Sequence, residues 1–317
     1  MQKRALKSYR YGPLFGWFRR VTSSRRKNIK TVRKMYQEGG LETRPCTICG
    51  ASDFRLLAKT DRYGFDLNKQ LCQACGLVQT MPSLKAEFLD TFYSKHYRPL
   101  YTKRIDVDYD KLILEQTAKG HRFYDYFIEQ GLGNALPNMS AIEIGCSSSG
   151  ILAALAPRVR HVQGCDLDVE GIEYGKKRYG FDLEVSALPS HLPSSPRLFI
   201  LSHVLEHLHD PLKTLRKIKD LMNKEDYLFI EVPGMNTVGE GNYGHDLWAY
   251  FHIAHVSDFT AGTMKVLAAR AGFKVLTCNE TVAALLKPSA ESSIPWTKSH
   301  EDSVENVLRI EATYQNK

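Results

Sequence analysis

The feature that most constrains the fold is a turn between a strand and a helix, AIEIGCSSSG at residues 141–150. An apolar strand leads into small residues, and a helix is expected from Ile151. A second apolar segment, VQGCDLD, has its first acidic residue at Asp166. In a doubly wound α/β sheet, small side chains let the backbone approach a nucleoside, while an acidic residue ending the next strand accepts hydrogen bonds from ribose hydroxyls. The pattern therefore predicts an adenosyl cofactor site at the carboxyl edge of a sheet.

Strands and helices alternate from about residue 139 onward, which predicts a mostly parallel sheet with helices on both faces. Gly272 is a good C-terminal cap for the last of these helices, and the two segments after it predict a hairpin at the sheet edge. The expected strands are 139–145, 162–166, 183–186, 198–203, 227–232, 273–278 and 282–287. The expected helices are 151–156, 169–179, 211–222 and 260–271.

The net charge of +8 comes from the N-terminal segment. Residues 1–40 hold 12 Lys and Arg and one acid, Glu38, whereas the rest of the chain holds 31 bases and 34 acids. This basic tail, with its apolar stretch Leu14–Phe18, could contact nucleic acid or an anionic membrane surface, or could simply be solvated. No apolar run approaches the roughly 20 residues that span a bilayer. We expect a cytoplasmic protein, with peripheral contact at the inner membrane surface left open.

Four of the seven cysteines form two Cys-x2-Cys pairs, and this spacing predicts one tetrahedral zinc site. Each pair is followed by a glycine, Gly50 or Gly76, where a tight turn needs positive φ. Four thiolates leave no open coordination position, so the zinc is expected to be structural and to supply folding energy. Two unrelated redox pairs are the alternative. The expected ligands are Cys46, Cys49, Cys72 and Cys75.

Four segments, in this order, resemble the class I S-adenosylmethionine-dependent methyltransferases: EIGCSSSG, GCDLD, LSHVLEHLHDP and LFIEVP. The third segment is the most specific of them. The resemblance covers about residues 139–288 and implies an α/β fold, with a doubly wound, mostly parallel, seven-stranded Rossmann-like sheet and a small N-terminal zinc ribbon. Dinucleotide binding is the competing interpretation of the turn, but the third glycine of that fingerprint is absent.

By this resemblance, Glu143 orients the amino group of the cofactor, Asp166 binds its ribose and Leu167 packs on its adenine. Considered alone, Asp166 could instead cap the following helix. Serines stand at two turn positions where the family usually has glycine, and a non-glycine at positive φ costs roughly 1 kcal/mol. The turn is therefore expected to be reshaped or to bind less tightly. Further cofactor contacts are expected from Gly145, Cys146, Ser147, Ser149, Ser186, Ala187, Leu188, Ser202 and His203.

The cysteine pairs, an FYSKHYRP segment and this core together resemble the sugar C-methyltransferases of deoxysugar and surface-polysaccharide pathways. Their motif after the fifth strand typically reads Tyr-x-Glu-His-x-Ser-x-Phe-Ser, and HIAHVSDFT aligns with it here. His255 then matches the base, while His252 and Ala254 replace the usual tyrosine and glutamate. Tyr93 and Tyr97 match the tyrosines that face the substrate. That family also has a long C-terminal substrate domain, for which residues 291–317 are too short.

These departures favour O-methylation of a glycan or related small molecule over C-methylation. A hydroxyl or carbon acid must lose a proton during the transfer, and histidine suits that task. We expect His255 as the general base, with His252 and Tyr97 as further catalytic candidates. A capping or core role is the alternative for both histidines. The loop beside the cofactor is expected to be held by Glu206, His207 and His209.

The expected organisation is a basic tail (1–40), a zinc-ribbon lobe (41–83), a helical connector (84–130), the cofactor-binding domain (131–290) and a polar C-terminal tail (291–317). The prediction is an S-adenosylmethionine-dependent methyltransferase that acts on a sugar, a polysaccharide precursor or a related small molecule. Two alternatives stay open. One is an RNA methyltransferase that uses the zinc ribbon and basic tail, and the other is a degenerate, non-catalytic binding protein.

Overall fold

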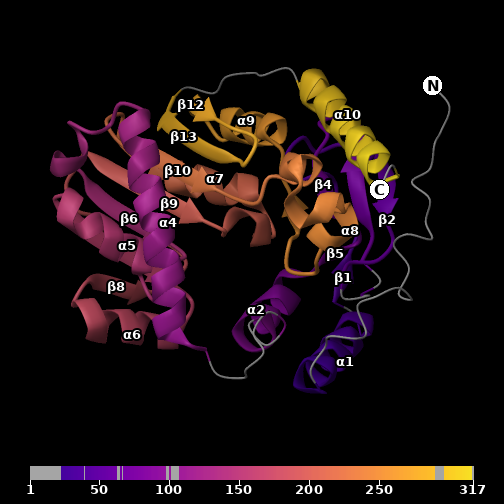
Figure 1. The fold of residues 1–317 in the computed structure, drawn as a ribbon, viewed down its shortest axis with the longest axis horizontal. Coiled ribbons are helices and arrows are strands. Elements are labelled where there is room, and N and C mark those ends of the chain that lie inside the picture. Colours follow the sequence, from indigo (N-terminus) through magenta and orange to yellow (C-terminus); the bar gives the residue numbers. More distant parts are fainter. Residues whose placement is uncertain are drawn as a thin grey trace.

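A seven-stranded sheet dominates the computed structural model, which describes residues 23–38, 40–62, 65, 67–97, 100, 107–289 and 296–315 (Figure 1). Five adjacent strands run parallel, and β13 is antiparallel to both of its neighbours. The strands confirm the predicted ones to within one residue at either end, including the closing hairpin. Their spatial order is β12 (Phe273–Cys278), β13 (Ala283–Pro288), β10 (Tyr227–Glu231), β9 (Arg197–Ser202), β6 (Ser140–Ile144), β7 (His161–Asp166) and β8 (Asp182–Val185).

Helices cover both faces of this sheet, because successive side chains of a strand point to opposite sides. In β6, Ala141 belongs to the core on one face and Ile142 to the core on the other. One face is covered by α4 (Tyr109–Glu129), α5 (Gly150–Leu155) and α6 (Val169–Tyr179). The other is covered by α7 (Pro211–Asp220) and α9 (Ala261–Arg270). The predicted doubly wound architecture is thus present.

Helix α4 crosses in front of the sheet in Figure 1, although its residues lie in the segment expected to be a connector. It packs directly on α5 at Gly120. A Cβ at this position would lie 2.7 Å from the Cβ of Ala154 and 2.8 Å from the carbonyl oxygen of Ile151. Only glycine permits so close an approach of the two helices. Helix α4 is therefore tied to the turn that follows β6.

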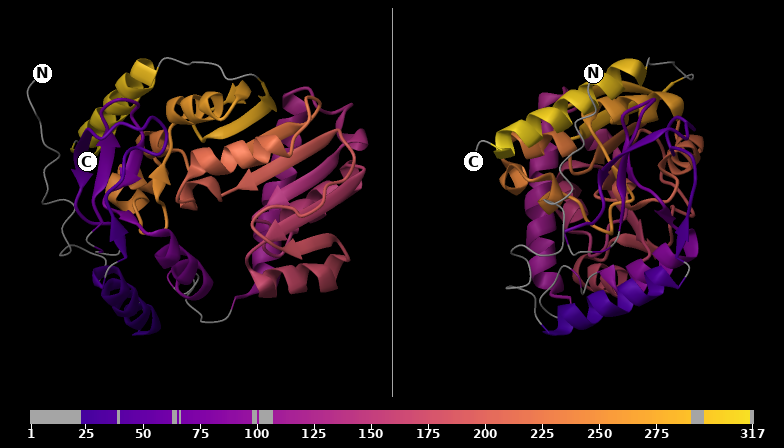
Figure 2. Two further views of the ribbon diagram at one scale, coloured as in Figure 1. Left: turned by 180° about the vertical axis from the view of Figure 1, so that it is seen from behind. Right: turned by 90° about the vertical axis from the view of Figure 1, so that its right-hand side faces the viewer.

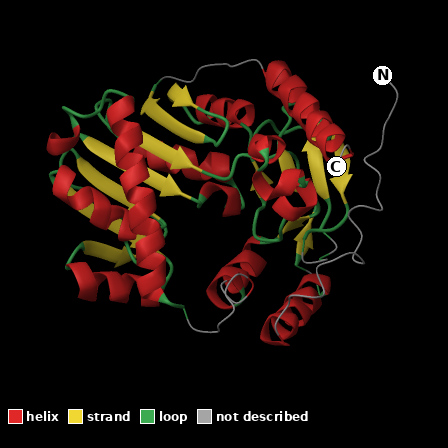
Figure 3. Ribbon diagram, viewed as in Figure 1, coloured by secondary structure: helices red, strands yellow, loops and turns green. Residues whose placement is uncertain are grey.

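A second sheet belongs to the four-cysteine lobe, by which we mean the described part of residues 41–84. Figure 3 shows its strands at the opposite end of the molecule from β8. The spatial order is β11 (Ser257–Asp258), β4 (Val78–Thr80), β3 (Lys69–Cys72) and β2 (Phe54–Ala58), all antiparallel. Strand β11 comes from the segment after β10, so the two parts of the chain share this sheet. A short ladder joins β1 (Leu41–Glu42) to β5 (Ser83–Leu84).

Both terminal segments contain long helices. Helix α1 (Ser23–Gln37) lies in the expected basic tail, and its Ile29, Val32 and Tyr36 share one core with α2 (Ala86–Lys95). The stretch Leu14–Phe18 lies outside the described residues. Helix α10 (Trp296–Gln315) occupies the expected polar tail and covers the four-cysteine lobe (Figure 2). There a Cβ at Gly76 would meet the Ser303 hydroxyl at 2.7 Å.

The remaining short helices lie near the carboxyl edge of the sheet or in connections. They are α8 (Leu247–Tyr250) and 3-10 turns at Leu136–Asn138, Ala156–Arg158, Leu205–His207, Met235–Glu240 and Asn242–His245. Among the helices of the described ranges, none combines the length and the apolar character needed to cross a bilayer.

Candidate cofactor site and neighbouring histidine cluster

The turn after β6 keeps a glycine-like backbone despite its serines. Gly145, Ser147 and Ser149 have φ values of 82°, 44° and 67°. These angles are normally occupied by glycine, so each serine costs roughly 1 kcal/mol. At Gly145 a side chain would also clash with that of Val204. Of the two expected outcomes, a reshaped turn or weaker binding, the first is absent, and the cost of the serines is local backbone strain.

Hydrogen bonds to two aspartates offset this strain. The Ser147 N–H donates to Asp166 Oδ2 at 2.7 Å, and the Asp168 N–H donates to Asp166 Oδ1 at 2.8 Å. The Ser147 hydroxyl donates to Asp168 Oδ2 at 2.9 Å, a bond that a glycine could not make. Asp166 thus ends β7 at the expected place and also holds the turn.

Gln116 of α4 supports the turn from the other side, which the sequence did not suggest. Its Oε1 accepts hydrogen bonds from the Gly150 N–H at 3.1 Å and the Ser148 hydroxyl at 3.0 Å. The first of these satisfies an N–H at the start of α5 that has no partner within its own helix. The signal was present in the sequence, because Gln116 interrupts the apolar stripe that includes Ile113 and Phe123.

Glu143 lies at the carboxyl edge of the sheet and is only 1% exposed. Burial raises the pKa of Glu143 well above its usual range, while the Lys119 ammonium opposes that change. One carboxylate oxygen, Oε2, has no hydrogen-bond partner. Lys119, another contribution of α4 that the sequence did not reveal, donates to the Ser202 hydroxyl at 3.3 Å. A buried acceptor without a donor fits the amino group of an amino-acid cofactor.

Apolar and polar groups beside Asp166 fit the adenosine part of such a cofactor. Leu167 is 68% exposed, an unusual state for leucine unless a ligand or partner covers it. The Ser186 N–H donates to the Asp166 carbonyl at 3.1 Å, and its hydroxyl donates to the Leu188 carbonyl at 2.8 Å. Ala187 lies between these two residues. Cys146 is buried in the core behind the turn. The residues expected at the cofactor thus gather at the ends of β6, β7, β8 and β9.

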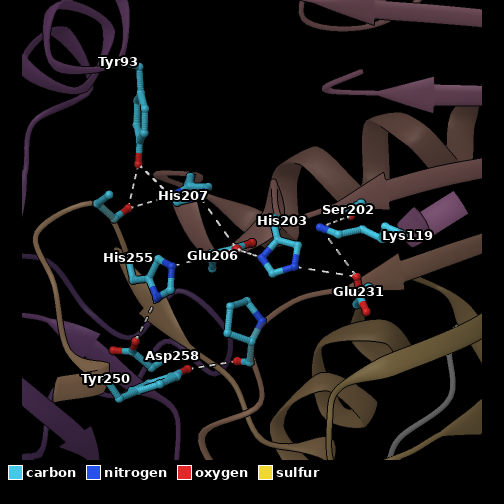
Figure 4. Close-up of polar contacts among 12 residues, drawn as sticks. Tyr93, Lys119, Ser202, His203, Glu206, His207, Glu231, Tyr250, His255 and Asp258 are labelled. Atoms are coloured by element: carbon cyan, nitrogen blue, oxygen red, sulfur yellow. Dashed lines mark hydrogen bonds and ion pairs between the residues drawn. The ribbon is translucent and has the colours of Figure 1, made fainter. Parts of the chain in front are cut away.

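A histidine cluster lies next to this edge and consists of His203, Glu206, His207, His252 and His255. Figure 4 shows His203, Glu206, His207 and His255 of this cluster. Glu206 is at its centre and is 1% exposed. Its Oε1 is 3.3 Å from His203 Nδ1, 3.7 Å from His207 Nε2 and 3.9 Å from His255 Nε2. Burial alone would raise the pKa of Glu206, but His207, His203 and His255 outweigh it and lower that pKa to about 2.

His203 connects the cluster to the cofactor residues. Its side chain is 40% exposed, and its Nε2 is 3.6 Å from Glu231 Oε2 at the end of β10. Burial lowers the pKa of His203, but Glu206 and Glu231 outweigh this effect and raise it to about 9. The same Glu231 oxygen lies 4.0 Å from Lys119 Nζ. His203 is therefore a cation at neutral pH, and it lies between the cofactor residues and the rest of the histidine cluster.

His255 and His252 are both buried and about 5% exposed, with ring centroids 3.6 Å apart. Burial lowers the pKa of His255 to about 4 and that of His252 well below its usual range. Both imidazoles are neutral at pH 7, which is the form that accepts a proton. His245, the third histidine of this segment, lies in the 3-10 turn at Asn242–His245.

The four-cysteine lobe holds the backbone of His255 in place. Lys69 Nζ donates to the His255 carbonyl at 2.6 Å and to Asp258 Oδ2 at 2.7 Å. Both side chains of this ion pair are fully buried. The Thr80 hydroxyl donates to the same carbonyl at 3.1 Å, and β4 pairs with β11 just beyond it. The lobe is thus part of the construction of the histidine cluster.

Two tyrosines, Tyr93 in α2 and Tyr97 just after it, contact the same cluster. The Tyr93 hydroxyl donates to the Ala254 carbonyl at 2.6 Å and lies 3.0 Å from His207 Nδ1. The ring of Tyr97 lies edge-on to His207, with centroids 5.5 Å apart. Both tyrosines therefore lie beside His207 of the cluster. His209 instead contacts Glu42 of the lobe.

The four cysteines of the lobe come together around one point. All four Sγ atoms lie within 4.8 Å of one another, with Cys46–Cys75 at 3.6 Å and Cys49–Cys72 at 3.4 Å. None of them forms a disulfide. Four sulfurs on one zinc ion with Zn–S bonds of about 2.3 Å lie about 3.8 Å apart. The donor set and its spacing therefore fit a tetrahedral zinc ion.

The two cysteine turns are built alike, with φ of 79° at both Gly50 and Gly76, as predicted. In each, the glycine N–H donates to the carbonyl of the first cysteine of the pair.

A family model described as a methyltransferase domain matches residues 117–278, which is about half of the chain. The chain belongs to this family. Together with the α/β sheet and the residues that gather at its carboxyl edge, this makes the protein an S-adenosylmethionine-dependent methyltransferase. A comparison with curated proteins found no match.

Solved structures with a similar fold include three methyltransferases. Each of these comparisons covers 64% of the present chain. One is an S-adenosylmethionine-dependent methyltransferase from Clostridium acetobutylicum (10% identity, 99% of that chain covered, TM-score 0.40). Another is the O-methyltransferase NcsB1 of neocarzinostatin biosynthesis (18% identity, 61% covered, TM-score 0.42). The third is magnesium protoporphyrin IX methyltransferase from Synechocystis (14% identity, 96% covered, TM-score 0.41).

Proposed function

We propose that the protein methylates an oxygen atom of a sugar, a polysaccharide precursor or a related small molecule. The observation that carries this proposal is the position of the histidine cluster. Its His203 directly follows β9, so the cluster adjoins the edge where Glu143 and Asp166 fit the cofactor. An acceptor molecule held between the cofactor residues and the histidine cluster would have the methyl donor on one side and the titratable side chains of the cluster on the other. Such positioning is the main task of a methyltransferase.

The chain's own residues suit each part of the cofactor. The free oxygen of Glu143 would accept a hydrogen bond from the amino group, and Asp166 would receive the ribose hydroxyls. Leu167 would cover the adenine, because its side chain is otherwise exposed. When bound, S-adenosylmethionine supplies a methyl group attached to a sulfonium sulfur. The bond between this sulfur and the methyl carbon breaks as the acceptor oxygen forms a bond to the methyl carbon.

Acceptor chemistry is assigned to the histidine cluster and its tyrosines. His255 is the proposed proton acceptor, because its imidazole is neutral and lies within the cluster. Tyr97, half-buried beside His207, offers an aromatic edge and a hydroxyl to a sugar. The residue at 254 is alanine, and no carboxylate accompanies His255 from that position. This composition suits a hydroxyl better than a carbon acid, since the hydroxyl is more readily deprotonated.

Zinc in the four-cysteine lobe would have a structural role. Four thiolates complete a tetrahedral shell and leave no position for a substrate. By holding the two cysteine turns together, the ion would stabilise the strands β3 and β4. These strands carry Lys69 and Thr80, which hold the carbonyl of His255.

The test is calorimetric titration of the zinc-loaded protein with S-adenosylmethionine, with NAD as the control ligand. We expect micromolar binding of the first and none of the second. Glu143→Gln should weaken this binding, while the same substitution at the exposed Glu173 should leave it unchanged. Radiolabelled methyl transfer should then be measured with nucleotide sugars, glycans and RNA. Labelling of RNA alone, or of no small molecule, would contradict the proposed acceptor class.

A further inference from the structure

We propose that Glu206, His207 and His255 form a second metal site, separate from the four cysteines, which binds a divalent transition-metal ion such as Zn²⁺. The role assigned to this ion rests on the proposed function, in which an acceptor hydroxyl lies beside the cluster. The binding itself is argued from the geometry of the three side chains alone. In the described part of the chain, these three residues and the four cysteines are the groups whose ligand atoms converge closely enough to hold an ion.

The first argument is distance. One oxygen of Glu206 lies 3.7 Å from His207 Nε2 and 3.9 Å from His255 Nε2, and all three atoms lie within 4.8 Å of one another. Ligands on an ion with bonds of about 2.1 Å are separated by about 3–4.2 Å, depending on the angle between them. A metal ion fits between these atoms with small movements of the side chains.

The second argument is the orientation of both imidazole rings. His207 Nδ1 lies 2.8 Å from the Ala254 carbonyl, which can only accept, so this nitrogen carries the proton. His255 Nδ1 lies 3.6 Å from Asp258 Oδ1. The Nε2 lone pair of His207 is therefore directed toward Glu206, and His255 Nε2 faces the same carboxylate at 3.9 Å. His207 thus shows the arrangement of metal-binding histidines, in which the second nitrogen donates to a carbonyl or carboxylate.

The third argument is the state of the Glu206 carboxylate. Both of its oxygens are buried and neither has a hydrogen bond. The partly exposed His203 cation lies 3.3 Å from Oε1 and compensates the charge of the carboxylate only in part. A divalent cation would bind all three groups at once, and the nearby His203 would remain a neighbour of the carboxylate. Asp258, whose Oδ1 lies 3.6 Å from His255 Nδ1, is itself held by Lys69 of the four-cysteine lobe.

Two histidines and one carboxylate leave coordination positions open, unlike four cysteines. Nitrogen and oxygen ligands of this kind suit Zn²⁺ and its neighbours among the transition metals. An acceptor hydroxyl bound at an open position would have its pKa lowered by the ion. His255 would then act as a ligand of the ion in place of accepting the proton itself, and the proton of the hydroxyl would pass to solvent.

The experiment measures zinc stoichiometry by elemental mass spectrometry after the whole protein has been dialysed to equilibrium against Zn²⁺. We expect two ions per chain in the wild type and one in Glu206→Gln. His207→Gln, at a less buried ligand, provides a second variant that should also bind one ion. His191→Ala is the matched control, because His191 is an exposed histidine paired with Asp182 and should leave two ions bound. Loading with Co²⁺ adds a spectroscopic readout: the variants should retain the thiolate charge-transfer bands and lose only the remaining absorption.

One zinc ion per chain in the wild type, or two in both ligand variants, would overturn the proposal. Cofactor binding is measured separately by calorimetry, so the two proposals fail in different ways. One zinc ion together with normal S-adenosylmethionine binding would refute the second metal site and leave the methyltransferase function intact. Two zinc ions without S-adenosylmethionine binding would support the metal site and refute the proposed use of the cofactor edge.

Discussion

The buried ion pair between Lys69 and Asp258 provides the strongest test of how the two parts of the chain depend on each other. Lys69→Met keeps a long apolar stem but removes the charge and both hydrogen bonds, to Asp258 and to the His255 carbonyl. Asp258 would then be a buried carboxylate without its cation. Removing one partner of a buried pair costs about 3–5 kcal/mol. We expect a loss of this size in the free energy of unfolding.

The measurement is urea unfolding of the zinc-loaded protein, and the control is the exposed pair of Lys111 and Glu115. Because that pair is solvated, Lys111→Met should cost less than about 0.5 kcal/mol. The double variant Lys69→Met/Asp258→Leu should recover most of the loss, since no charge is left buried. A Lys69→Met protein as stable as the Lys111→Met protein would refute the reasoning.

The same variant also separates the two functional regions. Lys69 binds the His255 carbonyl and Asp258, away from the turn after β6, so Lys69→Met should bind S-adenosylmethionine with nearly the wild-type affinity. Its methyl transfer should fall, because the carbonyl of His255 loses its charged donor. An equal loss of cofactor affinity would show that the lobe and the cofactor turn are coupled by a route other than Lys69.

Three further predictions concern the cofactor turn and the four-cysteine lobe. Gly145→Ala should weaken S-adenosylmethionine binding at least about tenfold in calorimetry, because a side chain at φ of 82° is strained and meets Val204; binding within a factor of two would argue against this geometry. Glu143→Gln should also weaken it about tenfold or more, since a charged hydrogen bond contributes about 1.5–3 kcal/mol; unchanged affinity would remove Glu143 from the site. Cys49→Ser, or chelation of zinc, should expose the amides of β3 and β4 to hydrogen exchange while those of β6 and β9 stay protected. Uniform protection in the chelated protein would show that the lobe needs no metal.

The sequence was sufficient for features that depend on residues close together along the chain. The helix 169–179 and the strand 273–278 were predicted with their observed bounds, because apolar periodicity and flanking glycines are local signals. The convergence of four cysteines followed from their spacing in the same way. At Ser147 and Ser149 the sequence left open a reshaped turn or weaker binding, and it did not predict the hydrogen bond from the Ser147 hydroxyl to Asp168.

Tertiary structure decided everything that depends on which distant groups meet. Gln116 and Lys119 reach the cofactor edge only because Gly120 lets α4 pack closely on α5. Lys69 reaches His255 only because β11 joins the sheet of the four-cysteine lobe. No local pattern encodes such long-range pairings.

The chemical state of the histidine cluster is decided in the same way. The sequence predicted His255 as a general base with the ordinary pKa of histidine. In the folded protein the pKa differs, because the cost of desolvating a charge depends on the surrounding atoms. The fold buries His255 beside Glu206, with a pKa of about 4, and leaves His203 partly exposed between two carboxylates, with a pKa of about 9. Local sequence therefore determined the sheet, the cofactor turn and the cysteine pairs. Only the folded chain determined which histidines are neutral, which is charged and which carboxylate they share, because burial and charge proximity are properties of the packed structure.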